Sequence, residues 1–448
     1  MKQDNKDKKD SKKSGSDGKK REPRKRGKLS WDKLDNTATL FPVIATQEMS
    51  NVYRIAVNLN EEVDEEILEE AVHRVVEQIP LFGMRLREGV FWYYFEENNK
   101  PLPRVMEETQ VPGAYINKTR NNQYMFRVTY YKCRINLEVF HALTDGFGGS
   151  IFLKEIVYQY LRLKHPEDLK DEKDKISSGI FLDSEDSYVK NFKKNKKYKK
   201  YKSSKAVTLE GEKFVNGKLG VMHGFMKFSE VRAASKKRGL TINQYIVGMF
   251  VYAVYKEYLN SSASKYPISC CVPVNLRPYY DSHTLKNFFA MVSADFQPDD
   301  REYTCDEVLN IVKENLEEKI TKKNLDDILS YNVSNEKNML LRIIPITVKK
   351  FALRRVYGAS THATTATITN IGNFKLKEPY EKYVENFYCI LSMSKGQNMK
   401  GAVLSYNGIL NINFSSCLTD TSIQKRFFKL IEQDGVEIAV ETNGVYYE

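Results

Sequence analysis

The chain has 448 residues, of which 41% are hydrophobic and 12% aromatic, so it can bury a sizeable core, and its length favours two lobes over one. Its formal charge of +12 comes from two segments. Residues 1–28 hold thirteen Lys and Arg against five acids, and residues 190–205 hold nine lysines and no acid. Subtracting their charges of +8 and +9 from the total leaves −5, so the body of the protein is mildly acidic.

The two basic segments predict solvated, disordered chain rather than a nucleic-acid reader. Phe192, Tyr198 and Tyr201 are the only aromatic residues near the lysines, and no reader motif accompanies them. We therefore expect no nucleic-acid partner. A weaker alternative is that the positive potential attracts an anionic ligand such as coenzyme A.

The sequence predicts a cytoplasmic location. The first residues contain no apolar segment typical of a secretory signal. The longest apolar run, residues 246–255, has ten residues including a glycine, which is too short to span a bilayer. The six cysteines have no CxxC spacing, so we expect them to be reduced. We also expect a monomer.

The first ordered elements alternate between strands and helices. Apolar periodicity predicts a strand over Tyr53–Leu59 and a helix over Glu65–Ile79. Two further strands, Tyr124–Tyr131 and Arg134–Phe140, predict a hairpin that turns at Lys132–Cys133.

The most informative segment follows this hairpin. His141 ends the strand, Asp145 comes four residues later in a glycine-rich turn, and residues 150–163 show helical spacing. A histidine at the mouth of such a turn can act as an exposed base, although a lone histidine at a strand end is more often structural. Gly146 permits a backbone conformation or a close approach that a side chain would block.

The second half of the chain opens with a predicted strand over Val221–Phe228. A helix capped by Ser229 and ended by Gly239 follows it. The pattern Thr241–Gln244 then predicts a reciprocal cap before an apolar helix that runs to Leu259.

Three later elements complete the prediction. A helix is expected over Asp306–Leu329, another over Thr421–Gln433 and a last strand over Glu437–Glu441. Strands and helices alternate irregularly, with many hairpins. This pattern favours a mixed α/β fold, a two-layer α+β sandwich, over a doubly wound parallel sheet.

Residues Ile346–Tyr357 predict a cationic amphipathic helix with Pro345 at its start. The favoured interpretation is a surface helix that packs its apolar side chains inward, namely Val348, Phe351, Ala352 and Tyr357. The alternative is peripheral contact with a membrane surface.

The pattern HxxxDG, formed by His141, Asp145 and Gly146 at a strand-to-helix turn, resembles a known acyltransferase superfamily. Its members include chloramphenicol acetyltransferase, alcohol acetyltransferases, plant acyl-CoA-dependent acyltransferases and peptide-synthetase condensation domains. The resemblance runs from about Leu34 to Asn443 and is nearest to bacterial alcohol acetyltransferase-type proteins. Further segments in the same order support it: Leu34–Asn36, Leu40–Pro42, Val272–Arg277 and Ile368–Gly372.

The resemblance implies two lobes with the active-site channel between them. With the charged stretches as a guide, we expect a disordered basic tail over residues 1–28 and an N-terminal lobe carrying the motif over residues 29–180. A Lys-rich linker over residues 181–210 and a C-terminal lobe over residues 211–448 follow.

The resemblance also implies the chemistry. The neutral imidazole of His141 would remove the proton of an alcohol or amine acceptor, and the acyl donor would be acyl-CoA, a co-substrate, with no acyl-enzyme. Asp145 would pair with Arg277 and anchor the histidine loop, because a bidentate pair fixes direction as well as charge. Asn370 would lie near the oxyanion of the tetrahedral intermediate.

Alternative functions stay open at this point. The acyl group could come from a carrier protein, as in condensation domains, but Phe140 stands where those domains usually have a second histidine. The chain could also be a non-catalytic binding protein. Neither HExxH nor a Cys/His cluster is present, so we expect no metal and no permanently bound cofactor.

Overall fold

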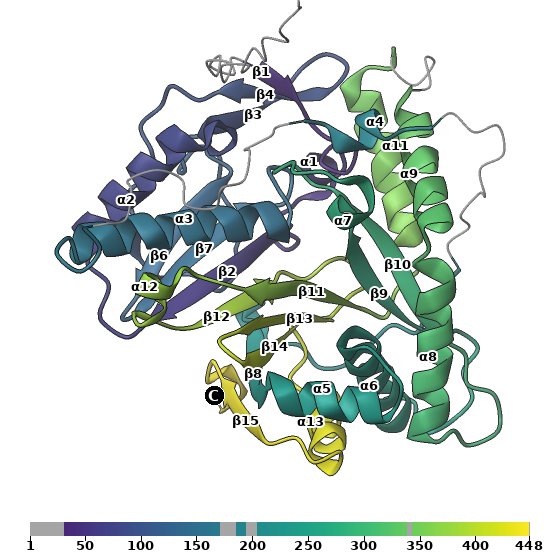
Figure 1. The fold of residues 1–448 in the computed structure, drawn as a ribbon. Coiled ribbons are helices and arrows are strands. Elements are labelled where there is room, and N and C mark those ends of the chain that lie inside the picture. The colour runs from purple at the N-terminus through teal and green to yellow at the C-terminus, as the bar shows by residue number, and fades with distance from the viewer. Residues whose placement is uncertain (1–30, 171–184, 194–203, 338–342, 448) are drawn as a thin grey trace, which may run out of the picture.

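The computed structural model describes residues 31–170, 185–193, 204–337 and 343–447 (Figure 1). The predicted tail, residues 1–28, and most of the Lys190–Lys205 run lie outside the described residues. The strands of the described residues form a five-stranded, a seven-stranded and a three-stranded sheet. The predicted mixed α/β fold is confirmed.

The five-stranded sheet has the order β12-β2-β7-β6-β5. Its strands are β2 (Val52–Leu59), β5 (Met106–Glu107), β6 (Phe126–Tyr131), β7 (Arg134–Phe140) and β12 (Val384–Leu391). The predicted hairpin of β6 and β7 is confirmed, because the two strands pair antiparallel up to Tyr131 opposite Arg134.

Helices α2 (Glu65–Gln78) and α3 (Gly146–Lys164) pack against each other beside this sheet (Figure 1). Asp64 caps α2 by accepting a hydrogen bond from the backbone of Ile67. Helix α3 is buried along most of its length, which explains why apolar residues occur on nearly all of its faces.

The seven-stranded sheet has the order β10-β9-β11-β13-β14-β8-β15. Its strands are β8 (Gly220–Lys227), β9 (Ile268–Asn275), β10 (Phe289–Phe296), β11 (Ala366–Phe374), β13 (Met399–Tyr406), β14 (Ile409–Ser416) and β15 (Ile438–Thr442). Strand β11 runs parallel to β9 and β13, whereas the other neighbours are antiparallel, so the sheet is mixed.

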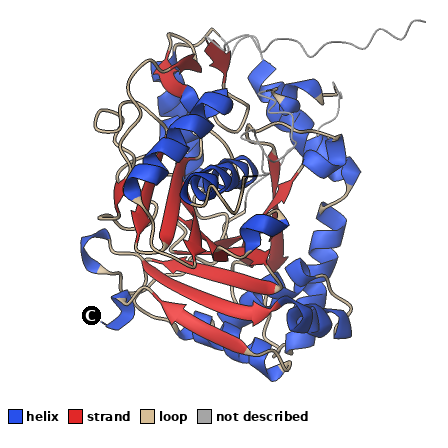
Figure 2. Ribbon diagram, turned by 60° about the vertical axis from the view of Figure 1, so that its left-hand side comes forward, coloured by secondary structure: helices blue, strands red, loops and turns tan. Residues whose placement is uncertain are grey.

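Long helices cover one face of the seven-stranded sheet (Figure 2). They are α5 (Phe228–Lys237), α6 (Ile242–Glu257), α8 (Cys305–Lys319), α9 (Lys322–Lys337) and α13 (Ser422–Gln433). The reciprocal cap predicted for α6 is confirmed, because Thr241 and Gln244 each bond the other's backbone.

Two predicted helix boundaries are wrong. Helix α5 begins at Phe228 directly after β8, so Lys227 occupies the cap position and Ser229 lies within the first turn. The single helix predicted over Asp306–Leu329 is divided near Ile320, where α8 ends and α9 begins soon after.

Shorter elements join the large layers. Strands β1 (Trp31–Lys33), β3 (Met84–Glu88) and β4 (Tyr93–Glu97) form the small sheet. The short helices are α1 (Phe41–Ile44), α4 (Ser187–Lys190), α7 (Arg277–Tyr280) and α12 (Glu378–Glu381), with 3-10 turns η1 (Pro80–Gly83), η2 (Val215–Gly217) and η3 (Val445–Tyr447).

Helix α11 (Ile346–Ser360) starts after Pro345, but its predicted inward packing is wrong. Val348, Phe351 and Ala352 are exposed, and of the four predicted side chains only Tyr357 packs against a core. No described part of the protein covers this face.

The last third of the chain contributes to both large sheets. Strand β12 pairs antiparallel with β2, whereas β11 and β13, on either side of it in sequence, belong to the other sheet. Phe387 and Tyr406 accordingly join the core formed by the first half of the chain. The predicted domain boundaries remain a prediction. Among the described residues, the helices are all too short or too polar to span a membrane.

Candidate active site

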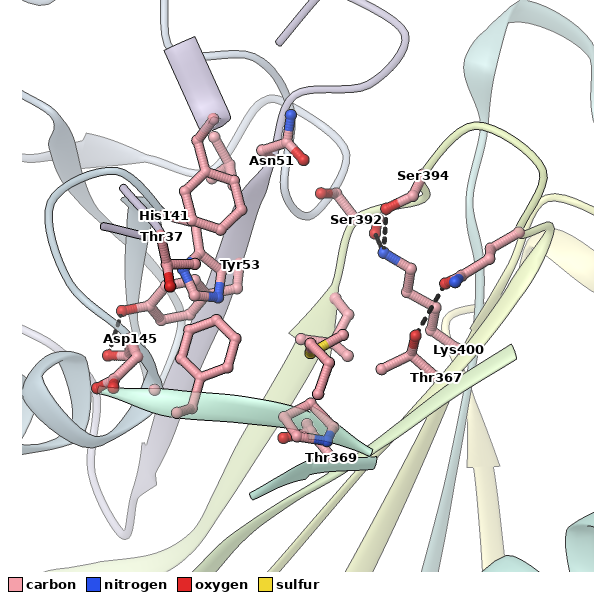
Figure 3. Close-up of a pocket in the computed structure, with 18 of the residues that line it drawn as sticks. Thr37, Asn51, Tyr53, His141, Asp145, Thr367, Thr369, Ser392, Ser394 and Lys400 are labelled. Carbon is pink, nitrogen blue, oxygen red and sulfur yellow. Dashed lines mark hydrogen bonds between the residues drawn. The ribbon is translucent and has the colours of Figure 1, made fainter. Parts of the chain in front are cut away.

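A cavity of about 380 Å³ is lined by residues from both large sheets (Figure 3). All five residues singled out in the sequence contribute to its lining: His141, Asp145, Gly146, Arg277 and Asn370. The fold therefore brings together residues that are more than 200 positions apart.

His141 is positioned by the end of β7 and by aromatic neighbours. Its backbone nitrogen donates to the carbonyl of Asn51 at 2.9 Å, which extends the pairing of β7 with the start of β2. Its ring stacks on Phe41 at 4.5 Å and meets the edge of Tyr53 at 5.2 Å. Burial among these rings lowers the pKa of His141 below its usual value, so the imidazole is neutral at neutral pH.

Asn287 holds the imidazole through its other nitrogen. Nδ1 of His141 lies 2.9 Å from Oδ1 of Asn287, and Nδ2 of Asn287 donates to Oδ2 of Asp35 at 3.0 Å. Because the amide nitrogen is directed to Asp35, the amide oxygen faces the histidine and can only accept. Nδ1 thus carries the proton, and Nε2 is left as the basic atom.

Asp35 is itself fully buried and held from two sides. Its carboxylate accepts hydrogen bonds from the backbone nitrogens of Ala38 at 2.8 Å and of Asn287 at 3.2 Å. Burial raises the pKa of Asp35 to about 7, which the hydrogen bonds only partly offset.

No role for Asp35 or Asn287 was predicted from the sequence. Asp35 lies inside the segment Leu34–Asn36 that contributed to the resemblance, so a signal was present. Asn287 lies in a loop before β10, where the sequence offers no pattern around it. Only the tertiary fold places its side chain beside His141.

Asp145 and Arg277 form a buried bidentate ion pair. The two guanidinium nitrogens lie 2.9 and 3.1 Å from the two carboxylate oxygens. The carboxylate also accepts from the backbone of Phe288 at 2.9 Å and from Gly148, at the start of α3, at 3.2 Å. Asp145 therefore joins the histidine turn to the loop before β10 and does not bond His141 itself.

The glycines of the turn allow close approach to two neighbours. A Cβ on Gly148 would lie 2.5 Å from the carbonyl oxygen of Leu285, and one on Gly149 would lie 2.6 Å from the hydroxyl of Tyr53. A Cβ on Gly146 would meet only the end of the flexible side chain of Ile371, at 2.8 Å. The tightest steric demand thus falls on Gly148 and Gly149 rather than on Gly146.

Asn370 lies on β11, where the pairing with β13 shifts in register before Gly372. Its Oδ1 accepts a hydrogen bond from the backbone nitrogen of Gly372 at 2.9 Å. The side chain is exposed and lines the same cavity as His141. Its amide nitrogen is the donor left for a ligand.

Another part of the cavity holds a group of polar side chains. Lys400 donates to the carbonyl of Ser392 at 2.8 Å and to the hydroxyl of Ser394 at 2.6 Å, while Thr367 donates to Gln397 at 2.9 Å. Figure 3 shows Lys400 and the two serines together, away from His141. Within the described ranges, His, Cys, Asp and Glu nowhere cluster in a way that could hold a metal ion.

Solved structures with the same architecture include enzymes and peptide-synthetase domains. Polyketide synthase associated protein 5 from Mycobacterium tuberculosis superimposes with a TM-score of 0.58 at 12% identity, over 89% of this chain and 97% of its own. The trichothecene 15-O-acetyltransferase from Fusarium sporotrichioides gives 0.57 at 10% identity, over 90% and 95%. The starter condensation domain of rhizomide synthetase, crystallised with C8-CoA, gives 0.55 at 10% identity, over 92% and 98%.

The chain has the same fold as these solved structures. The similarity spans nearly the whole of each partner, so the fold implied by the motif is confirmed. At the level of sequence, no family model and no curated protein matches the chain. In this fold the cavity between the two large sheets contains the HxxxDG residues.

Proposed function

We propose that the protein is an acyltransferase that moves an acyl group from a CoA thioester to the hydroxyl of an alcohol. The observation that carries the proposal is the state of His141. Its Nδ1 is bound to Asn287, its pKa is lowered by burial, and its ring lines a cavity between the two sheets. A neutral imidazole with one basic nitrogen at a cavity is what a general base requires.

The similar structures support this reaction class. One of them is named as an O-acetyltransferase, and another is a condensation domain crystallised with an acyl-CoA. Both reactions join an acyl group to a nucleophile. A CoA thioester as the donor is consistent with both.

The proposed reaction needs no acyl-enzyme. Nε2 of His141 accepts the proton of the acceptor hydroxyl while the oxygen forms a bond to the thioester carbon. The carbonyl becomes an oxyanion, for which Nδ2 of Asn370 is the proposed donor, oriented by the bond between Oδ1 and Gly372. The carbon–sulfur bond then breaks, and the imidazolium returns its proton to the thiolate.

Asp145 and Arg277 have a positioning role in this proposal. They do not touch the reacting atoms. Their ion pair fixes the start of α3 and the loop before β10, and Asn287 belongs to that loop. The same pair therefore determines where both His141 and its partner Asn287 lie.

The residues that line the cavity indicate the class of acceptor. Much of the cavity is apolar, including Leu40, Phe41, Ile44 and Leu391, which favours a lipophilic alcohol. The alternatives are an amine acceptor and a carrier-protein donor. Four further points remain predictions: the likeness to alcohol acetyltransferases, the cytoplasmic location, the monomeric state and the absence of a nucleic-acid partner.

The test is release of free thiol from acyl-CoAs of graded chain length, measured with a panel of alcohols and amines. We expect acceptor-dependent release that is fastest with an alcohol. Turnover only with carrier-bound thioesters would favour the condensation-type alternative. Binding of acyl-CoA without any turnover would favour a non-catalytic protein.

A further inference from the structure

Lys400 is a partly buried cation of the cavity that the proposed reaction does not use. It lies on β13, and Figure 3 shows its ammonium bound to Ser392 and Ser394, at the end of the cavity opposite His141. These two oxygens occupy two of its three hydrogen-bond donors. A third donor remains for a ligand.

The charges of the lining do not balance. Arg277, Lys395 and Lys400 are its cations, and Asp145 is its one acid among the described residues. Asp145 is already paired with Arg277, whereas Lys395 is exposed. The partly buried cation of the lining without a carboxylate partner among the described residues is therefore Lys400.

No carboxylate of the described residues lies within ion-pairing distance of Lys400. Burial without such a partner lowers the pKa of Lys400 to about 8, so the side chain is still mostly charged at neutral pH. A partly buried ammonium whose hydrogen bonds go to neutral oxygens is stabilised by an anion that reaches it.

The cavity that contains Lys400 and the base is also lined by apolar residues. Ile371, Cys389 and Leu391 line the cavity together with both groups. The charge of Lys400 nevertheless contributes to lowering the pKa of His141, so the two ends interact electrostatically. A ligand that fills the cavity would have a reacting group at one end and an apolar middle.

We propose that Lys400, with Ser392 and Ser394, binds a carboxylate carried by the substrate at the end away from the reacting group. The inference rests on the proposed acyl transfer and names its substrate class. A single ammonium matches a single carboxylate, whereas the several phosphate charges of coenzyme A would need several cations. The carboxylate could belong to the acceptor, as in a hydroxy acid, or to the acyl group, as in a dicarboxylic acyl-CoA.

The experiment has two arms that distinguish these sources. In the first, hydroxy acids of graded length are compared with their methyl esters as acceptors for acetyl-CoA. In the second, dicarboxylic acyl-CoAs are compared with monocarboxylic acyl-CoAs of equal length, with one fixed alcohol. Each arm uses wild type, Lys400→Met and Lys154→Met. Lys154 is a partly buried lysine of α3 outside the cavity lining, so it controls for loss of charge.

We expect wild type to prefer the carboxylate in one arm, and Lys400→Met to lower that preference at least about tenfold, the effect of one charge-assisted hydrogen bond. Lys154→Met should leave the preference unchanged. No preference in either arm, or a preference that survives Lys400→Met, would overturn the inference. Calorimetry measures binding of the same hydroxy acids independently of turnover. If the proposed reaction fails, binding that is lost in Lys400→Met but kept in Lys154→Met still supports the carboxylate site.

A second surface carries an independent inference. Helix α11 exposes Val348, Phe351 and Val356 at 56, 64 and 67% of their surface. The turn between β3 and β4 lies beside it, because the backbone of Ile346 donates to the carbonyl of Val90 at 2.8 Å. Val90 and Trp92 in that turn are 69 and 50% exposed. We call these five exposed side chains the α11 surface.

The helix that carries most of the α11 surface is rich in cations. Lys349, Lys350, Arg354 and Arg355 lie within the helix, and residues 343–360 contain no acid. Lys350 is paired with Glu88 of β3 at 2.6 Å, so its charge is compensated. Arg355 lies over the ring of Phe351 at 5.5 Å, so charge and apolar area adjoin. Exposed apolar residues beside cations fit the interface of an anionic bilayer.

We infer that the α11 surface docks on an anionic lipid membrane. Tyr357 of the same helix lines the cavity, so docking would bring the cavity close to lipophilic acceptors in the bilayer. A helix that exposes Phe and Val beside cations favours a lipid surface, because an anionic bilayer offers both apolar chains and negative charge. A protein partner could be bound through charge alone or through apolar area alone.

The test is co-sedimentation of the full chain with vesicles of phosphatidylcholine alone or with one quarter phosphatidylglycerol. The variant Val348→Ser with Phe351→Ser is compared with Val440→Ser with Ile409→Ser, two exposed apolar residues of the seven-stranded sheet. We expect binding to anionic vesicles that falls at least about fivefold in the first variant only, about the effect of removing two partly inserted side chains. The inference would be overturned if wild type did not bind anionic vesicles, or if Val348→Ser with Phe351→Ser bound them as well as wild type. It would also be overturned if wild type self-associated and this double variant did not.

Discussion

Oδ1 of Asn287 lies 2.9 Å from Nδ1 of His141, and this contact determines which imidazole nitrogen is basic. The amide cannot rotate without losing a hydrogen bond, because its nitrogen donates to the buried carboxylate of Asp35. The hydrogen-bonded series Asp35–Asn287–His141 thus places a proton on Nδ1 and leaves Nε2 for the proposed acceptor.

Asn287→Leu should lower kcat by about tenfold or more, because loss of a buried hydrogen bond releases the ring from its tautomer and orientation. Acyl transfer by the purified variant measures the effect. Asn413→Leu is the matched control, since Asn413 is equally buried on β14 and binds His223 outside the cavity lining. Equal losses of activity in the two variants would mean that Asn287 acts only through stability.

The ion pair between Asp145 and Arg277 predicts strong coupling. Asp145→Asn and Arg277→Ala should each cost about 3–5 kcal/mol of unfolding free energy, because each leaves an unpaired buried charge or a broken network. The double variant should cost much less than the sum. Urea unfolding measures the cycle.

The control cycle uses Arg426 and Glu257, a half-exposed ion pair between α13 and α6. Its coupling should stay within about 1 kcal/mol. Coupling of the same small size for Asp145 and Arg277 would show that their pair does not anchor the turn.

The sequence contains more of the site than of the contacts that hold it. His141, Asp145 and Gly146 lie in one continuous segment, so a local pattern could identify them. Arg277 and Asn370 could be named only through a resemblance. Asn287 contacts His141 across 146 positions of sequence and has no local signal, so its role could not be predicted.

The errors in the predicted helices also come from contacts that are not local in the sequence. The cap of α6 was predicted correctly because Thr241 and Gln244 satisfy each other within one turn. Ser229 failed as a cap because β8 continues directly into α5. The inward packing of Phe351 was wrong because a helix face is buried only where a tertiary neighbour covers it.

Gly148→Ala should lower the unfolding free energy by about 1–3 kcal/mol, because its Cβ would approach a backbone oxygen that cannot move independently. Thermal unfolding measures the change. Gly358→Ala is the control, because a Cβ there has open space and alanine favours the helix. A wild-type melting temperature for Gly148→Ala would mean that the turn adjusts freely.

The pH dependence of kcat/KM should report the lowered pKa of His141. Burial disfavours the imidazolium, with a further contribution from Lys400, and these outweigh the opposite effect of Asp145. The base is active above its pKa, so activity should persist below pH 6.5 before it falls, about one pH unit lower for each 1.4 kcal/mol of stabilised neutral form.

Asp35 titrates in the same range, since its pKa is raised to about 7. Asp35→Asn removes that titrating group, so the remaining fall of kcat/KM at low pH belongs to His141. If the activity of this variant fell with a midpoint above pH 7, the result would contradict a base that is neutral at neutral pH.

The most direct test of the account is acyl transfer by His141→Ala. We expect a variant with wild-type thermal stability and wild-type binding of acyl-CoA by calorimetry, and a kcat lowered by about 10²–10⁴-fold, because only the base is removed. Transfer within a few-fold of wild type, by a variant that still binds acyl-CoA, would show that His141 is not the base.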